Sequence, residues 1–322
     1  MENKIIEALK NSRKVLVTMH VHPDPDAMGA ALAMVLFLKS LGKDVRLYNE
    51  DACPSWLAFM PRAVLCRKVS GQERFVPDTA VILDCGDLER IGKVRGLIPA
   101  GARVINIDHH ITNKLFAELN LVKKKYSSTS EILFELLKHA GCVFTKDIAI
   151  LLYLGILTDT GSFGFDSTTS HTHEVIAELL KFNIPVARLY RQVYETLPRE
   201  DLKAFLSAMN RLELECGERV ACLMMTRKDV ALFSEGFDIR DKIFGFLRAV
   251  KGLDVIVIIT EADNGRVRIN MRGRGVLDVA RISQKFNGGG HKNASGCYIS
   301  GTMSQARIKI LSAIKEGLKW KG

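Results

Sequence analysis

Four short segments rich in aspartate and histidine carry the residues of this chain that are best suited to chemistry. They are His20-Val21-His22-Pro23-Asp24-Pro25-Asp26, Asp84-Cys85-Gly86-Asp87, Asp108-His109-His110 and Thr158-Asp159-Thr160-Gly161. Carboxylates mixed with imidazoles favour Mn²⁺ or a similar ion over Ca²⁺ or a thiolate-bound Zn²⁺. Two such ions about 3.5–4 Å apart can hold a hydroxide and clamp a phosphoryl oxygen. The segments therefore predict one two-metal site, provided that the fold brings them together.

Three of these segments follow short apolar runs that should place them at one edge of a sheet. The runs have the length and the Val, Ile and Leu content of buried parallel strands. They cover residues 15–19, 80–83 and 104–107. Open α/β sheets usually bind ligands at strand ends, so we expect the acids and imidazoles to meet there. Pro23 and Pro25 should keep the first segment extended, with Asp24 and Asp26 pointing in different directions toward two adjacent ions.

Alternating strand and helix patterns predict an N-terminal α/β domain, with a mostly parallel sheet flanked by helices. The expected strands are residues 14–19, 44–48, 80–84 and 103–107. The expected helices are residues 1–10, 27–41, 89–97, 129–139, 146–157 and 170–182. Asp26 is predicted to cap the second helix and Gly42 to close it. Ser128-Thr129-Ser130-Glu131 has the sequence of a capping box.

The last third of the chain has a different pattern, which predicts a second, smaller α/β domain with a mixed sheet. Strands are expected at residues 220–225, 255–260 and 267–271. Asn264-Gly265, between the last two, is typical of a β-hairpin turn. We predict a first domain over residues 1–190, a helical linker over 191–214, a second domain over 215–322, and a cleft between the domains.

Composition narrows the class of protein. An apolar content of 47% and a charged content of 25% are typical of a soluble globular protein. No apolar run approaches the ~20 residues that a membrane span requires, and the first ten residues lack the long apolar region of a signal peptide. The seven cysteines are widely spaced and form no CxxC pair. This pattern argues against a disulfide framework or a zinc ribbon and fits a reducing cytoplasm.

Positive charge is concentrated in the last third. Residues 1–214 hold 27 basic and 25 acidic side chains, whereas residues 215–322 hold 19 and 11. Such a region is either a solvated basic surface or a surface for an anionic ligand, such as a nucleotide or a short nucleic acid. Arg266, Arg268, Asn270 and Arg272 alternate along one predicted strand and so share a face. Arg272 is the best single candidate for a phosphate contact, because a guanidinium matches phosphate geometry.

Asp108-His109-His110 and its companion segments together resemble the DHH phosphoesterase superfamily, in which the four motifs occur in this order. Gly288-Gly289-Gly290-His291, followed by Ala294-Ser295-Gly296, resembles the glycine-rich signature of the DHH-associated nucleotide-binding domain. The combination is similar to the short two-domain subgroup that includes oligoribonuclease/pAp phosphatases. Pyrophosphatases of the superfamily have a different C-terminal domain, and RecJ-type nucleases are usually longer. The resemblance covers about residues 1–310.

The resemblance implies a metal-binding role for six residues. One Mn²⁺ would be held by His20, Asp24 and Asp84. The other would be held by Asp26, Asp84, His109 and Asp159, with Asp84 bridging the two ions. Mg²⁺ or Co²⁺ would be able to substitute for Mn²⁺.

The resemblance also implies catalytic and substrate-binding roles for particular residues. His110 would contact the scissile phosphate and assist the leaving group, while Asp108 would orient a neighbouring histidine. Together with the bridging Asp84, these residues form the expected catalytic set. The expected substrate-binding set is Arg272, Gly289, Gly290 and His291.

The function implied is that of a cytoplasmic, Mn²⁺-dependent phosphoesterase that hydrolyses very short oligoribonucleotides, pAp (3′-phosphoadenosine 5′-phosphate), or both. An alternative is a phosphodiesterase acting on pApA or on cyclic di-AMP. A third reading is a nucleotide- or RNA-binding protein without activity, whose sequence signature would be the loss of metal ligands. None of the six is lost here. We expect no membrane association and no obligate protein partner. A homodimer is compatible with the sequence, although no residue pattern requires one.

Overall fold

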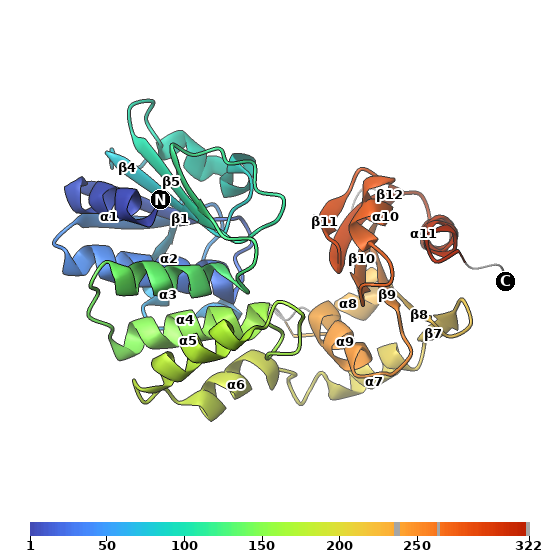
Figure 1. Cartoon of the computed structure of the whole chain (residues 1–322). Helices are drawn as coiled ribbons and strands as arrows, with labels where there is room; N and C mark the ends of the chain where they lie inside the picture. The colour runs from blue at the N-terminus through green and yellow to red at the C-terminus, as the bar shows by residue number, and fades with distance from the viewer. Residues whose placement is uncertain (235–238, 263–264, 320–322) are drawn as a thin grey trace. The chain divides into compact units, whose positions relative to one another are not determined.

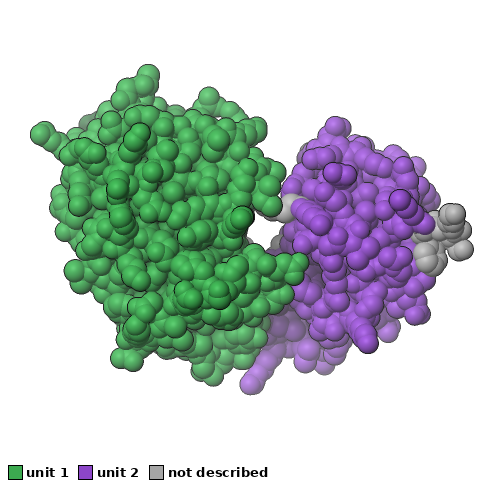
Figure 2. All heavy atoms as spheres, in the orientation of Figure 1, with its two compact units in different colours: residues 1–195 green, residues 196–322 purple. Residues whose placement is uncertain are grey.

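The computed structural model describes residues 1–234, 239–262 and 265–319, and the chain divides into two compact units (Figures 1 and 2). Unit 1 is Met1–Glu195 and unit 2 is Thr196–Gly322. Each unit has a sheet covered by helices, so the predicted α/β class is confirmed. The segment 191–214, expected as a linker, is divided between them: helix α6 (Val186–Tyr194) belongs to unit 1 and α7 (Leu202–Met209) to unit 2.

Unit 1 is built on a six-stranded sheet in which every pair of neighbours is parallel. The strands are β1 (Lys14–Met19), β2 (Asp44–Asn49), β3 (Cys66–Lys68), β4 (Thr79–Leu83), β5 (Arg103–Asp108) and β6 (Leu119–Val122). Their order across the sheet is β3-β2-β1-β4-β5-β6. The chain therefore proceeds from β1 to one edge and returns to fill the other, so the order reverses between β1 and β4. In such sheets the carboxyl ends of the strands at the reversal form a crevice.

Helices cover both faces of this sheet, which explains why its strands are apolar on both sides. The helices that pack on the sheet are α1 (Glu2–Asn11), α2 (Pro25–Ser40), α3 (Thr129–His139) and the kinked 3₁₀ helix η3 (Leu88–Leu97). Helices α4 (Lys146–Asp159) and α5 (Ser170–Leu180) pack in turn on α2 and α3. Val15 and Val17 of β1 belong to the core that contains α1 to α5. Leu16 faces the other side and packs with Val94 of η3.

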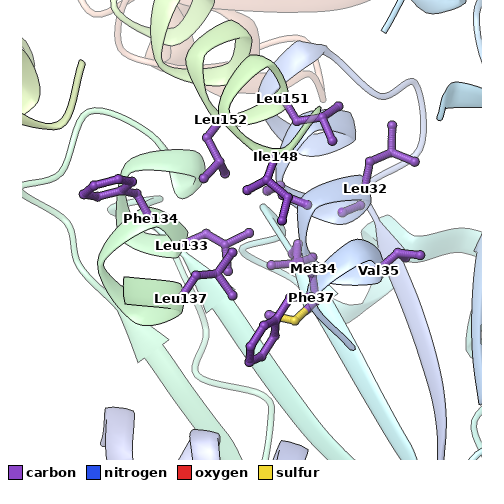
Figure 3. Packing of buried hydrophobic residues seen from close by; sticks show 14 of the residues in the cluster. Leu32, Met34, Val35, Phe37, Leu133, Phe134, Leu137, Ile148, Leu151 and Leu152 are labelled. Carbon is purple, nitrogen blue, oxygen red and sulfur yellow. The ribbon is translucent and has the colours of Figure 1, made fainter. Parts of the chain in front are cut away.

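Helix α2 is buried almost along its whole length and packs closely against α3 and α4 (Figure 3). A β-carbon added to Gly29 would lie 2.4 Å from the Leu151 carbonyl oxygen, so the backbones of α2 and α4 nearly touch. Gly42, with φ of 73°, follows the helix as expected for a residue that closes it. Close helix packing thus fixes the beginning of α2 relative to the end of α4.

Two short edge strands were not predicted, and one predicted helix boundary was too early. Strands β3 and β6 are only three and four residues long, so they carry little periodic signal. Between β2 and β3 the chain forms only two single-turn helices, η1 (Ser55–Leu57) and η2 (Ala63–Leu65). Helix α4 continues two residues beyond the expected end at 157 and includes Thr158 and Asp159.

Unit 2 has a mixed sheet of six strands in the order β11-β12-β10-β9-β8-β7. The strands are β7 (Glu213–Glu215), β8 (Val220–Met225), β9 (Val255–Glu261), β10 (Arg266–Gly273), β11 (Gly289–His291) and β12 (Ala294–Ser300). The helices after α7 are α8 (Arg227–Val230), α9 (Ile239–Arg248), α10 (Val279–Gln284) and α11 (Met303–Gly317). Strands β9 and β10 pair antiparallel, as predicted for a hairpin; Asn264 of the expected turn lies outside the described residues.

The two faces of this second sheet bury separate cores. Val257 and Ile259 of β9 pack in the core that includes α10 and α11. Ile256 and Ile258, which alternate with them, pack in the core that includes α7 and α9. Across the described part of the chain, no helix has both the length and the apolar composition needed to cross a bilayer. All seven cysteines are free thiols.

Candidate metal centre

The carboxyl ends of β1, β4 and β5 bring three of the four predicted segments together. The strands are neighbours, with Met19 opposite Leu83 and Leu83 opposite Ile107. His20, Asp84 and Asp108 therefore occupy equivalent positions at adjacent strand ends, where the strand order reverses. This is the placement that the apolar runs predicted.

The first segment is helical sooner than expected, which changes the roles of its two aspartates. Helix α2 begins at Pro25, a residue suited to the first helical position because its fixed φ matches the helix and its missing N–H is not needed there. Asp24 is the N-cap, and its Oδ1 accepts a hydrogen bond of 2.9 Å from the Ala27 N–H. The predictions that Asp26 caps this helix and that Asp24 and Asp26 alternate along an extended segment are therefore wrong.

Asp26 lies instead inside the first turn of α2, where its side chain is completely buried. Its two oxygens accept hydrogen bonds from backbone N–H groups at the start of α3, at 2.7 Å from Thr129 and 2.9 Å from Ser130. The space for this contact depends on Gly155 of α4, where an added β-carbon would lie 2.6 Å from Asp26 Oδ1. Three helices thus meet at one carboxylate.

Six of the predicted residues form two groups, each able to hold a metal ion. The groups are His20, Asp24 and Asp84, and Asp26, His109 and Asp159; within each, the candidate ligand atoms lie within 4.8 Å of one another. In the second group His109 Nε2 is 3.1 Å from Asp159 Oδ2, which reaches it from the last residue of α4. A further combination, Asp84, His109 and His110, has the same spacing.

Asp84 lies between the two groups. Its Oδ2 is 3.4 Å from His20 Nε2, and its Oδ1 is 3.6 Å from His109 Nε2. The residue has φ of 54°, a left-handed conformation that costs a non-glycine residue about 1–3 kcal/mol and persists only where the surroundings impose it. One carboxylate thus faces both groups from a strained position at a strand end.

Crowding of like charges shifts the pKa values at this centre. Burial, followed by the charges of Asp84 and Asp24, raises the pKa of Asp26 well above its usual value. Loss of solvent and the charge of Asp26 raise the pKa of Asp159 in the same way. Burial also opposes ionisation of Asp84, but the hydrogen bond and charge of His20 outweigh it and hold the pKa well below the usual range. Crowded carboxylates beside imidazoles are a donor set that fits divalent cations.

His110 is held by a short chain of hydrogen bonds. Its Nδ1 lies 2.6 Å from Asp108 Oδ1, while the other oxygen of Asp108 accepts a bond of 2.6 Å from Asn113 Nδ2. Asn113 also donates to Oδ1 of the buried Asn106, so a pair of amides holds the aspartate through Asn113. Burial lowers the pKa of His110, but the contact with Asp108 outweighs this effect and the pKa is raised. Asp108 therefore orients a histidine, while the asparagines were not singled out from the sequence.

The start of α3 is a second part of the centre that the sequence did not reveal. Besides the backbone bonds to Asp26, the Thr129 hydroxyl donates a hydrogen bond of 2.9 Å to Asp84 Oδ1. The Ser128 hydroxyl accepts from the Glu131 N–H, as predicted for a capping box, but the Glu131 carboxylate accepts from Ser127 rather than from the cap residue. The capping motif was recognisable from the sequence; its position beside the acidic residues was not.

The predicted substrate-binding residues lie in unit 2. Arg272 is on β10, where its guanidinium stacks over the Phe244 ring at 4.5 Å from the centroid and lies 3.8 Å from Asp241 Oδ1. Gly289 and Gly290 are in β11, which pairs with β12. Gly290, with φ of 139°, leaves no room for a β-carbon beside the Ala294 carbonyl, whereas Gly289 faces open space. His291 ends β11, and its side chain lies outside what the structure describes.

Comparisons with known proteins agree with this architecture. The sequence matches the DHH family N-terminal domain over residues 14–156 and the DHHA1 domain over residues 237–319. It is 30% identical to the bifunctional oligoribonuclease and PAP phosphatase NrnA of Thermus thermophilus, over 96% of this chain and 91% of that protein. Identity to the Bacillus subtilis protein of the same name is 27%, over 93% of each chain.

A solved structure also has the same fold over nearly the whole chain. The crystal structure of an exopolyphosphatase-related protein from Bacteroides fragilis superposes with a TM-score of 0.91 and 27% sequence identity. The superposition covers 98% of this chain and 95% of that one. The chain therefore belongs to the DHH family, with a DHHA1 domain in its C-terminal part, and is a hydrolase of phosphoester bonds.

Proposed function

We propose that this chain is a two-metal phosphoesterase that hydrolyses very short oligoribonucleotides and pAp. The observation that carries the proposal is the position of Asp84, whose two oxygens face two separate groups of candidate ligands. Relatives named oligoribonuclease and PAP phosphatase, matched over more than nine-tenths of this chain, support the choice of substrates. The free thiols of all seven cysteines fit a reducing compartment, the cytoplasm.

In this proposal unit 1 holds the metals and performs the chemistry. His20, Asp24 and Asp84 hold one Mn²⁺, and Asp26, Asp84, His109 and Asp159 hold the second. When bound, the two ions supply a hydroxide nucleophile and neutralise charge on the phosphoryl group. The ligand carboxylates come from a loop, a strand end and two helix ends, all anchored in the buried core of unit 1, so little entropy is lost in holding the ions.

His110 acts on the phosphate directly. Asp108 holds Nδ1 of the ring at 2.6 Å, which fixes the direction in which the rest of the imidazole points. The raised pKa favours the protonated ring, in which both nitrogens are donors, because Asp108 stabilises the positive charge. We assign His110 the contact with the scissile phosphate and the transfer of a proton toward the leaving oxygen.

Unit 2 binds the nucleotide part of the substrate. Arg272, whose guanidinium is held by the Phe244 ring and by Asp241, is assigned a contact with a substrate phosphate. Gly289 and Gly290, which are exposed residues of β11, are assigned further phosphate contacts together with His291. The metal-binding domain then corresponds to residues 1–190 and the substrate-binding domain to residues 215–322.

The proposal is tested by a turnover assay in Mn²⁺ with five substrates: pAp, pApA, a five-nucleotide RNA, cyclic di-AMP and pyrophosphate. The wild-type protein should hydrolyse pAp and the short RNA. Asp84→Asn, which keeps the shape but removes the bridging charge, should lose at least about 1,000-fold in kcat. Asp87→Asn is the matched control, because Asp87 lies in the same segment but pairs with Lys114 at the surface.

The outcomes separate the candidate functions. Dominant turnover of pApA or cyclic di-AMP would assign the chain to the degradation of nucleotide signals. Turnover that survives in Asp84→Asn would contradict the two-metal centre. Binding of Mn²⁺ without hydrolysis of any substrate would favour a nucleotide- or RNA-binding protein.

A further inference from the structure

Thr129 contacts two of the candidate metal ligands at the same time. Its backbone N–H donates to Asp26 Oδ2 at 2.7 Å, and its side-chain hydroxyl donates to Asp84 Oδ1 at 2.9 Å. These carboxylates belong to different segments of the chain, and Asp26 is in one ligand group while Asp84 faces both. A single residue at the first position of α3 therefore joins the two halves of the centre.

The position of Thr129 is itself fixed by buried hydrogen bonds. Its side chain is completely buried, as are those of its neighbours Ser128 and Ser130. The Glu131 carboxylate accepts bonds of 2.7 Å and 2.5 Å from the N–H and hydroxyl of Ser127, and one of 3.3 Å from the Thr172 hydroxyl of α5. The first turn of α3 is thus held from the preceding loop and from a neighbouring helix, and cannot easily follow a movement of the ligands.

The orientation of the Asp84 carboxylate depends on the hydrogen bond from Thr129. Its left-handed backbone at a strand end sets the direction of the side chain, but rotation about the Cβ–Cγ bond would turn both oxygens away from the ligand groups. Asp84 Oδ2 lies 3.4 Å from His20 Nε2, and Asp84 Oδ1 lies 3.6 Å from His109 Nε2. The Thr129 hydroxyl forms the shortest of these contacts to Oδ1, so it fixes the plane of the carboxylate.

We propose that Thr129 is a positioning residue that sets the affinity of the centre for both metal ions. It orients the carboxylate of Asp84 through its hydroxyl and holds Asp26 through its backbone N–H. The inference rests on the proposed two-metal function. It adds a residue that binds no ion itself but orients two metal ligands by hydrogen bonds. Because Asp84 serves both groups, loss of the hydroxyl should weaken both binding steps.

The test is a calorimetric titration of the full-length, metal-free protein with Mn²⁺. Thr129→Val has nearly the same shape but no donor, and we expect both dissociation constants to rise by about 10- to 100-fold. Thr129→Ser restores the hydroxyl and should bind within about threefold of wild type. Thr79→Val removes a buried hydroxyl at the opposite end of β4, where it contacts Ser12 and none of the candidate ligands, and should leave both constants unchanged.

Each outcome supports or overturns the inference. Wild-type affinity in Thr129→Val would overturn the inference, and so would equal weakening in Thr79→Val, which would indicate that loss of any buried hydroxyl loosens unit 1. Asp84→Asn is included because retention of both ions in that variant would contradict the proposed centre itself. If Thr129→Val does not fold, as judged by circular dichroism, Thr129→Ala removes the same donor without adding bulk and replaces it in the titration.

Discussion

The two units hold their candidate functional residues in opposite ways. In unit 1 the carboxylates of Asp26 and Asp84 are almost completely buried, and other buried groups fix their orientation. In unit 2 the polar side chains of β10 are partly exposed, although both faces of its sheet bury apolar cores. The comparison teaches that the candidate ion-binding residues depend on rigid and costly burial of charge, whereas the candidate nucleotide-binding residues lie on a partly exposed strand.

Removal of divalent ions should lower the stability of unit 1 and leave that of unit 2 unchanged. Chelation by EDTA should lower the free energy of unfolding of unit 1 by about 2.7 kcal/mol for an ion that was present at 100 times its dissociation constant. Amide hydrogen exchange with and without Mn²⁺ should show the change at the starts of α2 and α3. Unit 2, which contains none of the six ligands, serves as the internal control. An equal loss of protection in β10 would contradict the separation.

Substitution of the glycine that makes room for Asp26 should destabilise unit 1. The β-carbon of Gly155→Ala would lie 2.1 Å from the Ser130 hydroxyl and 2.6 Å from Asp26 Oδ1. We expect a loss of about 1–3 kcal/mol in the free energy of unfolding, measured in urea, together with weaker Mn²⁺ binding. An unchanged midpoint would mean that the start of α3 can move away from α4.

Truncation of Arg272 tests the proposed role of unit 2 in substrate binding. Arg272→Ala should raise KM for pAp roughly 10-fold and leave kcat within about twofold, because a phosphate contact remote from the reacting bond binds substrate and transition state equally. Arg281→Ala is the matched control, since Arg281 is an exposed arginine of the same unit that pairs with Asp278. A fall in kcat at constant KM would instead place Arg272 in the chemical step.

The smallest expected effect is a gain in stability. Gly245 lies within α9 of unit 2, and a β-carbon added there meets no atom within 4 Å. Gly245→Ala should therefore stabilise the protein by about 0.5–1 kcal/mol, measured in urea, because alanine loses less backbone entropy in a helix. The two variants together compare Gly155, where packing in the helix requires a glycine, with Gly245, where it does not. A destabilised Gly245→Ala would show that this face of α9 is covered.

The sequence predicted the central elements well because their signals are local. The apolar runs before His20, Asp84 and Asp108 located β1, β4 and β5, and the strand-end argument placed the acidic segments at one edge of the sheet. The mixed sheet of unit 2 was also predicted, although three of its strands were missed. Glycines dominate β11, and small or polar residues make up most of β12. Strand β7 falls largely in the segment expected to be a helical linker and is only three residues long.

The support of the centre could not be predicted, because it depends on contacts between distant parts of the chain. The hydroxyl of Thr129 meets a carboxylate 45 residues earlier, and its N–H meets one 103 residues earlier. The cap of α2 was misassigned because both Asp24 and Asp26 are good capping residues, and only Pro25 at the first helical position decides between them. Packing, rather than local preference, determines which side chains share a site.

The convergence of helix ends on the centre has an electrostatic consequence. Helices α2 and α3 begin there, and N–H groups of their first turns donate to Asp24 and Asp26, so the partial positive charge of two helix N-termini faces the carboxylates against that of one C-terminus, the end of α4. This dipole field partly compensates the negative charge before any cation arrives. We therefore expect the side chains of the candidate centre to keep their arrangement in the metal-free protein, so that divalent ions would bind and leave without unfolding of unit 1.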